Sequence, residues 1–379
     1  MNLISTPDRG QVNTLSLAET DVRYPEESST VSELQESTVN LDINSDLLES
    51  EGPWPQRYRL LVATFKENQG LVIGVSSGLS FVLISHKVVK HYTTKAIVKA
   101  QNDFEAIRQR VHEVQEKAAR SGKGPLVELD AQAINSGHRS FQVLHVKNPV
   151  NDSLPASEKK YFFYFQGARG EFSTGLELFS HISNELDSDV IVINTAKNTR
   201  NSSELYKSFA DITSHLLEHE LMANPSKVTF YGISLGAGVA THVTQSLHKA
   251  SPAKKVRLIA DRGFNSMSGI LKQASTIHKL PSRFLPQWLH GGAITSLGWN
   301  IKNQKAWDKI DDDYKMAFVN DRDLVVNPSN QLGHGSRNVK QLEFDVHDDS
   351  KVHTMGVRHG RIDGSEAFKT IKNFHFRIK

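Results

Sequence analysis

Beyond Lys159, the feature that most constrains the fold is an alternation of short apolar runs with longer amphipathic segments. The apolar runs have the length of strands and the segments between them have helical spacing, so the pattern predicts βα units. Strands of such units are buried on both faces of a parallel sheet. The expected strands are 161–165, 190–194, 228–231, 256–260, 316–320 and 342–346, and the expected helices lie near 174–186, 202–223, 236–249 and 364–374. We therefore expect a largely parallel sheet covered by helices, with ligands at the carboxyl ends of the strands.

Three more elements are expected before this region. From Lys95 to about Arg120, apolar residues recur at helical spacing among charges, which predicts an amphipathic helix. Leu126 to Ala133 and Arg139 to Val146 are strand-like runs, and the turn residues NSGH separate them. Together the two runs predict an antiparallel hairpin.

Charge is distributed unevenly along the 379 residues, although the formal net charge is only +3. Residues 1–53 hold eleven acids and two bases, whereas residues 54–379 hold 31 acids and 43 bases. The first segment is also rich in Ser and Thr without a sustained apolar period, so we expect a disordered acidic tail. The chain has no Cys, which excludes disulfides, thiolate nucleophiles and Cys-ligated zinc. Covalent catalysis would have to use Ser, Thr, Lys or a carboxylate.

Residues 54–124 combine an apolar stretch with a basic one. Leu71 to Ser85 carries no charge, but fifteen helical residues span about 22 Å, short of the roughly 30 Å hydrocarbon core of a bilayer. From His86 to Lys99 there are four Lys, two His and no acid. Two interpretations stay open: attachment to an anionic membrane surface through Leu71–Lys99, or an element packed on the body with its basic flank in water.

The most informative local motif is Gly232-Ile233-Ser234-Leu235-Gly236, directly after the strand expected at 228–231. A Ser on a strained turn between a strand and a helix presents its hydroxyl above the sheet only if small residues lie two before and two after it. Gly232 and Gly236 meet that requirement, so Ser234 is the predicted nucleophile. The alternative is an ordinary glycine-rich turn.

A nucleophilic Ser needs a base and an orienting acid, which follow it in the order Ser, acid, His in folds of this kind. Asp323 is the first choice of acid because the apolar residues 324–326 would anchor a following helix, and Asp321 is the second. His359, shortly before the last helix, is the first choice of base, and His353 is the second.

An oxyanion hole would complete the site. One N–H group would come from Leu235, which follows the nucleophile, and the other from the glycine-rich loop 166–170 after the strand 161–165. The expected donor in that loop is Ala168. A plain turn between a strand and a helix would have the same sequence.

We expect neither a cofactor nor a metal. There is no GxxxxGK[ST] motif and no GxGxxG that opens a helix after a strand. His215 and His219 are four residues apart, but the HExxH order is absent. The basic residues are mostly scattered without interleaved aromatics, so we do not expect nucleic acid as a partner.

Residues from about 125 to 379 resemble the α/β-hydrolase superfamily in the segments YFFYFQGARG, VTFYGISLGAGVA, VNDRDLVV and RHGRIDG. In SLGAGVA, DRGFNS and the loop 194–203 the chain is similar to the lipase-like proteins of intracellular bacterial pathogens, chlamydial and Legionella effectors among them. It departs from the commonest pattern at Gln166, where many relatives carry His. The resemblance implies a serine hydrolase with a Ser-His-Asp triad that cleaves an acyl ester, such as a lipid or a membrane-associated ester. Residues 264–305, which hold many large apolar side chains, lie where relatives place a cap over the acyl pocket, and an added pair of core helices is the alternative interpretation.

Other functions share the same residues. A thioesterase or peptidase would use an identical triad, and a membrane-associated interaction or effector protein would keep the scaffold without activity. The start of the chain lacks the features of a Sec signal, so we expect a bacterial cytoplasmic protein or one delivered into a host cell by another route, with peripheral membrane attachment as a further expectation. The sequence leaves the oligomeric state open.

Overall fold

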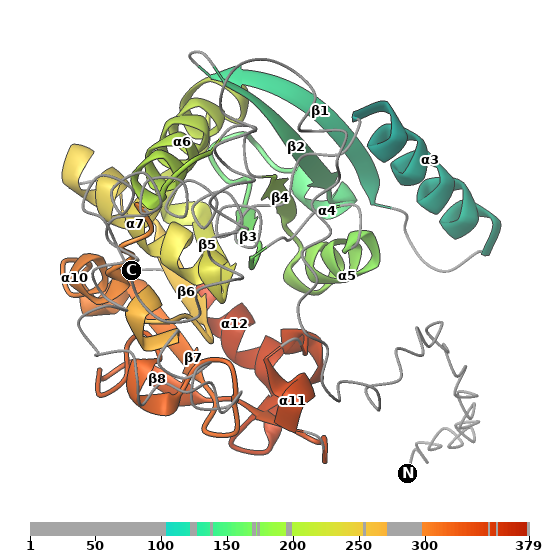
Figure 1. The fold of residues 1–379 in the computed structure, drawn as a ribbon. Coiled ribbons are helices and arrows are strands. Elements are labelled where there is room, and N and C mark those ends of the chain that lie inside the picture. Colours follow the sequence, from blue (N-terminus) through green and yellow to red (C-terminus); the bar gives the residue numbers. More distant parts are fainter. Residues whose placement is uncertain are drawn as a thin grey trace, which may run out of the picture. The chain divides into compact units, whose positions relative to one another are not determined.

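The computed structural model describes residues 104–121, 127–136, 139–168, 172, 175–194, 199–252, 255–270, 298–347, 349–353 and 355–376 (Figure 1). The acidic segment 1–53, the apolar and basic stretches of Leu71–Lys99 and the middle of the expected cap lie outside these residues. Within the described part of the chain, none of the helices combines the length and the apolarity needed to cross a membrane.

Eight strands form one sheet, in the spatial order β1-β2-β4-β3-β5-β6-β7-β8. The predicted hairpin is present, because β1 and β2 pair antiparallel, and β2 is also antiparallel to β4. All later pairs are parallel. The strands are β1 Glu128–Ser136, β2 Arg139–Lys147, β3 Tyr161–Phe165, β4 Asp189–Ile193, β5 Val228–Ile233, β6 Arg257–Asp261, β7 Lys315–Val319 and β8 Val339–Gln341. A mostly parallel sheet of this order, flanked by helices, confirms the predicted α/β-hydrolase fold.

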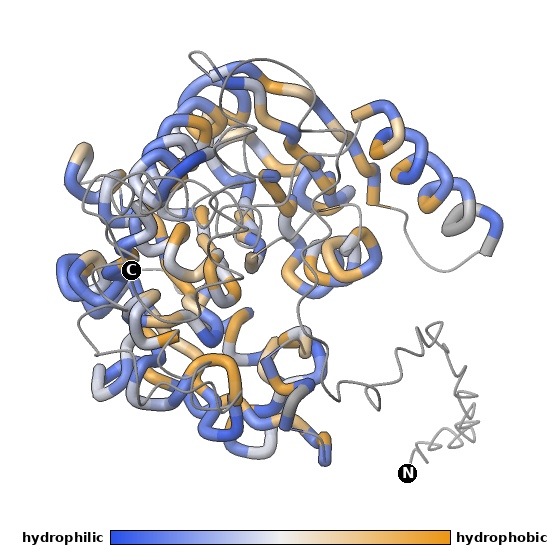
Figure 2. Tube along the Cα trace, in the orientation of Figure 1, coloured by the Kyte–Doolittle hydropathy of each residue, from blue (hydrophilic) through white to orange (hydrophobic). Residues whose placement is uncertain are grey.

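Helices cover both faces of the sheet, and each face has its own buried core. The first core joins the sheet to α6 Ser202–His215, α7 Leu235–Ala250 and α10 Asn303–Trp307. The second joins it to α3 Phe104–Ser121, α5 Leu176–Leu186 and α12 Ala367–His375. Strand β3 shows how one strand serves both, since Phe163 lies in the first core and Phe162 in the second. The hydrophobic colouring along the central strands follows from this double burial (Figure 2).

Shorter elements connect these layers. A π-helical turn, η3 Leu216–Glu220, continues α6 and accounts for the length of the helix expected near 202–223. The other short helices among the described residues are α4 Pro149–Asp152, α11 Asp349–Val352, η4 Pro225–Lys227, η6 Asp312–Tyr314, η7 Pro328–Asn330 and η8 Val357–His359.

Two predicted elements are wrong. The run 342–346 is not a strand of the main sheet, because β9 Glu343–Phe344 belongs to a separate three-stranded sheet with β10 Gly360–Ile362 and β11 Ser365–Glu366. The alternation of buried Leu342 and Phe344 with exposed Glu343 is the pattern of a half-buried antiparallel strand. The helix expected after Asp323 is absent as well. Asn327 precedes Pro328, and a residue in that position disfavours helical backbone.

Candidate active site

Ser234 lies on a sharp turn between β5 and α7, as the motif predicts. Its backbone has φ 54° and ψ −117°, a conformation that is uncommon for a residue with a side chain. Two backbone hydrogen bonds hold the turn: the Ser234 N–H donates to the Asp261 carbonyl at 2.9 Å, and the Ala237 N–H donates to the Ser234 carbonyl at 3.1 Å. The strained conformation is therefore fixed by β6 on one side and by the first turn of α7 on the other.

Glycine is required on both sides of Ser234 by close backbone contacts. A Cβ atom on Gly232 would overlap the Gly236 carbonyl, and a Cβ atom on Gly236 would overlap the carbonyls of Phe165 and Gln166. Each clash is with backbone that cannot rotate away. The roles predicted for Gly232 and Gly236 therefore agree with the geometry of the turn.

Three polar side chains form a hydrogen-bonded line at this turn. His353 Nε2 lies 2.9 Å from Ser234 Oγ, and His353 Nδ1 lies 2.8 Å from Asp323 Oδ2. The His353 side chain is 12% exposed and the Asp323 side chain is fully buried, so the pair is largely shielded from water. A carboxylate accepts hydrogen bonds and does not donate them. His353 Nδ1 therefore carries a hydrogen, which leaves Nε2 free to accept the Ser234 hydroxyl proton.

Asp323 reaches this position from the carboxyl end of β7. Its Oδ1 atom accepts the N–H groups of Val325 and Val326 at 2.8 and 3.0 Å, and this leaves Oδ2 for His353. The prediction of Asp323 over Asp321 agrees with the geometry, because Asp321 is exposed to solvent. Asp323 does not start the helix that the sequence predicts: it organises a turn, and Leu324 and Val325 are each 43% exposed.

The choice of His359 over His353 is wrong. His353 follows α11 and contacts both Ser234 and Asp323, whereas His359 ends η8 and is exposed. The His359 ring accepts a hydrogen bond from Arg358 Nε at 2.9 Å, and burial together with that neighbouring cation lowers the pKa of His359. The chain after His359 enters the hairpin β10–β11 before α12 begins, so closeness to the last helix in sequence did not indicate closeness to Ser234.

The loop after β3 passes directly beside Ser234. A Cβ atom on Gly167 would lie 3.6 Å from both Ser234 Cβ and the Ile233 carbonyl. Leu235 is the first residue of α7, so its N–H group has no partner within the helix. Ala168 lies in an exposed turn of the β3 loop. Both expected oxyanion donors are thus in segments that adjoin the nucleophile, and the donor role of Ala168 remains a prediction.

Two contributors to this region were not predicted from the sequence. Asn194, at the end of β4, accepts a hydrogen bond from Gln166 Nε2 at 3.2 Å and one from the Phe172 N–H at 3.1 Å, so it fixes the loop beside Ser234. Arg262 follows β6 and is fully buried. Each is a polar residue directly after a buried strand, and that position is the signal that was available in the sequence.

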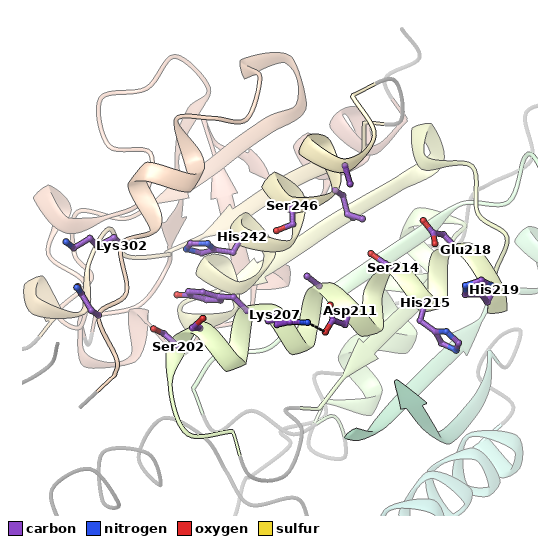
Figure 3. Close-up of a pocket in the computed structure, with 16 residues that line it drawn as sticks. Ser202, Lys207, Asp211, Ser214, His215, Glu218, His219, His242, Ser246 and Lys302 are labelled. Atoms are coloured by element: carbon purple, nitrogen blue, oxygen red, sulfur yellow. Dashed lines mark hydrogen bonds and ion pairs between the residues drawn. The ribbon is translucent and has the colours of Figure 1, made fainter. Parts of the chain in front are cut away.

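A separate groove of about 920 Å³ lies between α6 and α7 (Figure 3). Tyr206 and His242 stack in its wall with their ring centroids 3.9 Å apart. Burial lowers the pKa of His242 to about 4, so this ring is neutral at physiological pH. Neither Ser234 nor His353 nor Asp323 lines the groove. The hydrogen-bonded line from Ser234 to Asp323 and this groove are therefore distinct features of the described chain.

No family model matches the sequence, and no curated protein matches it either. Solved structures with a similar fold include an α/β hydrolase from Vibrio vulnificus (14% identity, TM-score 0.45). The matched region covers 69% of this chain and 86% of the Vibrio protein. A hyperthermophilic esterase from Pyrobaculum calidifontis (11% identity, TM-score 0.38) matches over 59% of this chain and 76% of its own chain. A thermostable esterase from Pseudomonas putida (14% identity, TM-score 0.38) matches over 57% of this chain and 79% of its own chain. Likenesses this low decide neither activity nor substrate.

Proposed function

We propose that this protein is a serine hydrolase that cleaves acyl esters through a covalent acyl-enzyme. One observation carries the proposal: Ser234 Oγ, the His353 ring and the Asp323 carboxylate form a continuous hydrogen-bonded line on a strained turn at the carboxyl end of β5. A buried acid, an oriented imidazole and a hydroxyl within 2.9 Å of it are the components needed to activate a serine.

In the proposed reaction, Ser234 Oγ attacks the ester carbonyl carbon while His353 Nε2 takes the hydroxyl proton. Asp323 stabilises the imidazolium that forms. The Leu235 N–H and a second N–H from the Gly167–Ala168 loop stabilise the oxyanion of the tetrahedral intermediate. Collapse of that intermediate breaks the ester C–O bond, and the leaving alcohol takes the proton from His353. Water then attacks the acyl-serine by the same steps and releases the acid.

Two other functions would use the same scaffold. A non-catalytic interaction or effector protein needs no hydrogen-bonded triad, and the intact line from Ser234 to Asp323 favours an enzyme over it. A thioesterase or peptidase would need the same three residues. An ester is favoured over a peptide because an alcohol oxygen is a better leaving group than an amine nitrogen, whereas the triad itself does not separate an ester from a thioester. Turnover of matched ester, thioester and anilide substrates separates the three classes.

A narrower substrate class belongs to the same proposal. A lipid or membrane-associated ester is suggested by the apolar stretch and the basic cluster of Leu71–Lys99 and by the apolar side chains of the expected cap. In that setting the protein acts at an anionic membrane surface, inside the bacterium or after delivery into a host cell.

The direct test is hydrolysis of a p-nitrophenyl ester series from acetate to palmitate, with a matched thioester and a peptide anilide. Purified wild type should show a burst of p-nitrophenol equal to one per active site, as expected for an acyl-enzyme. Ser234→Ala should show neither burst nor turnover. Hydrolysis by Ser234→Ala at the wild-type rate would disprove the proposal, and faster turnover of the thioester or anilide would reassign the substrate class.

A further inference from the structure

Arg262 is a fully buried cation that lies between the nucleophile turn and the loop carrying the base. It follows β6 directly, in the left-handed conformation with φ 45°, and its N–H donates to the Phe318 carbonyl of β7 at 2.9 Å. A non-glycine residue persists in this conformation when its surroundings fix it. For Arg262, the hydrogen bonds of its own side chain fix the conformation.

All five N–H donors of the Arg262 guanidinium are matched by acceptors. Two bonds go to the Asp261 carboxylate, from Nε to Oδ1 at 2.7 Å and from Nη2 to Oδ2 at 2.8 Å. Three go to backbone carbonyls at the end of α11 and in the loop after it: Val352 at 2.5 Å, His353 at 3.3 Å and Met355 at 2.7 Å. The three carbonyls belong to the base itself, to the residue before it and to the second residue after it. A lysine, with three donors on one atom, cannot reproduce this fork.

Asp261 ties the same cation to the nucleophile. Its backbone carbonyl accepts the Ser234 N–H, and its carboxylate accepts the hydroxyl of Tyr231 on β5 as well as the guanidinium. The side chains of Asp261 and Arg262 are both fully buried. Burial alone would lower the pKa of Arg262, but the Asp261 carboxylate keeps that pKa above its usual range. In the dipeptide Asp261-Arg262, the first residue therefore binds the backbone of Ser234 and the second binds the backbone of His353.

We infer that Arg262 is a positioning residue for the proposed reaction: with its charge balanced by Asp261, it holds the His353 loop against the nucleophile strand. It thereby keeps His353 Nε2 within hydrogen-bond distance of Ser234 Oγ. The inference rests on the proposed function, because a held base matters only if Ser234 is to be deprotonated. Arg262 touches no reacting atom itself; it acts through the carbonyls that it binds. A shift of the base by about 1 Å costs on the order of 100-fold in rate.

Three variants separate positioning from general stability. Arg262→Met alone leaves the Asp261 carboxylate buried without its partner, so this protein is expected to lose its fold. The double variant Asp261→Asn with Arg262→Met removes both charges and keeps an amide oxygen for Tyr231. Arg262→Lys keeps the ion pair but cannot bridge all three carbonyls. Lys315→Met is the matched control, because Lys315 is a buried cation that binds the carbonyls of Trp307 and Ile310, away from the three residues of the triad.

The first measurement is the second-order rate constant for labelling of Ser234 by a fluorophosphonate, per folded molecule, with the folded fraction taken from urea unfolding. The double variant should label on the order of 100-fold more slowly than wild type. The labelling rate constant of Arg262→Lys should lie between those of wild type and the double variant, and Lys315→Met should label at the wild-type rate. A folded double variant that labels as fast as wild type would overturn the inference.

The second measurement does not depend on activity. The proton shared by His353 Nδ1 and Asp323 should give a downfield NMR resonance that is absent from His353→Gln. We expect the double variant to lose it and Lys315→Met to retain it. Retention in the folded double variant would refute positioning by Arg262. If wild type fails to label, the proposed hydrolase function fails, and this resonance still decides whether Arg262 holds the base.

Discussion

Burial distinguishes the residues of the site from their neighbours in sequence. Asp321 and Asp323 both follow β7, but only Asp323 is enclosed, with one carboxylate oxygen bound to backbone N–H groups and the other to His353. His353 and His359 are likewise close in sequence, and only His353 faces Ser234. The chemical type of each residue was visible in the sequence, whereas its burial depends on how the loops close.

Asp323→Asn should lower kcat by roughly 10³- to 10⁴-fold, because an amide at this position favours the wrong tautomer of His353 and cannot stabilise the imidazolium. The measurement is ester turnover by the purified variant. Asp321→Asn, two residues away and exposed, is the matched control and should retain the wild-type rate. Equal losses in the two variants would contradict the assignment of Asp323.

The nucleophile turn is the element on which the site depends. Gly236→Ala should destabilise the protein by about 2–3 kcal/mol, because its Cβ would overlap the backbone carbonyls of Phe165, the last residue of β3, and of Gln166. Gly356→Ala is the matched control: its φ is −69°, and its Cβ would meet nothing closer than Arg358 Cγ at 3.9 Å. Urea unfolding of both variants measures the difference. A Gly236→Ala protein as stable as Gly356→Ala would show that the turn relaxes.

Helix α12 is attached to the sheet through a buried histidine. His375 Nε2 lies 2.8 Å from Ser188 Oγ, and Nδ1 lies 2.8 Å from Thr229 Oγ1. Burial, with the nearby cations Arg257 and Lys160, lowers the pKa of His375 to about 3. The folded protein therefore holds this ring neutral at pH values where the unfolded chain binds a proton.

This difference predicts acid sensitivity. Because the unfolded chain binds the extra proton between about pH 6.5 and pH 3, His375 stabilises the fold above pH 6.5, and this stabilisation is lost as the pH falls. The loss should be about 1.4 kcal/mol per pH unit between pH 6 and pH 4. Urea unfolding across that range should show a shallower pH dependence in His375→Gln, whereas His334→Gln, an exposed control, should match wild type. An equal dependence of the unfolding free energy on pH in wild type and both variants would contradict the role of His375 in acid sensitivity.

How far the elements were predictable depended on the kind of pattern. Strand β3 was expected at the residues it occupies, because continuous apolar runs between helices indicate parallel strands. The run 342–346 alternates instead, and alternation is compatible with any half-buried sheet edge. The short hairpin β10–β11 left no comparable pattern, and without it the base could not be placed from the sequence.

The eight-stranded sheet brings together residues that are distant along the chain. Ser234, Asp323 and His353 follow β5, β7 and α11, and 119 residues separate the nucleophile from the base. The net positive charge of residues 54–379 includes the cluster His86–Lys99, through which we predict contact with an anionic membrane surface.

Replacement of Lys87, Lys90, Lys95 and Lys99 by Gln should reduce flotation with anionic liposomes, because each lysine near such a surface contributes about 1 kcal/mol of attraction. Raising the salt concentration should weaken wild-type binding in the same direction. Neutral liposomes are the control. Equal recovery of wild type and variant would remove this cluster as the membrane contact.

In the proposed reaction His353, and not His359, activates Ser234. The rate of fluorophosphonate labelling should therefore be compared among wild type, Ser234→Ala, His353→Gln and His359→Gln. We expect rapid labelling of wild type and of His359→Gln, none of Ser234→Ala, and a loss on the order of 10³-fold or more in His353→Gln. Undiminished labelling of His353→Gln, or a comparable loss in His359→Gln alone, would contradict it.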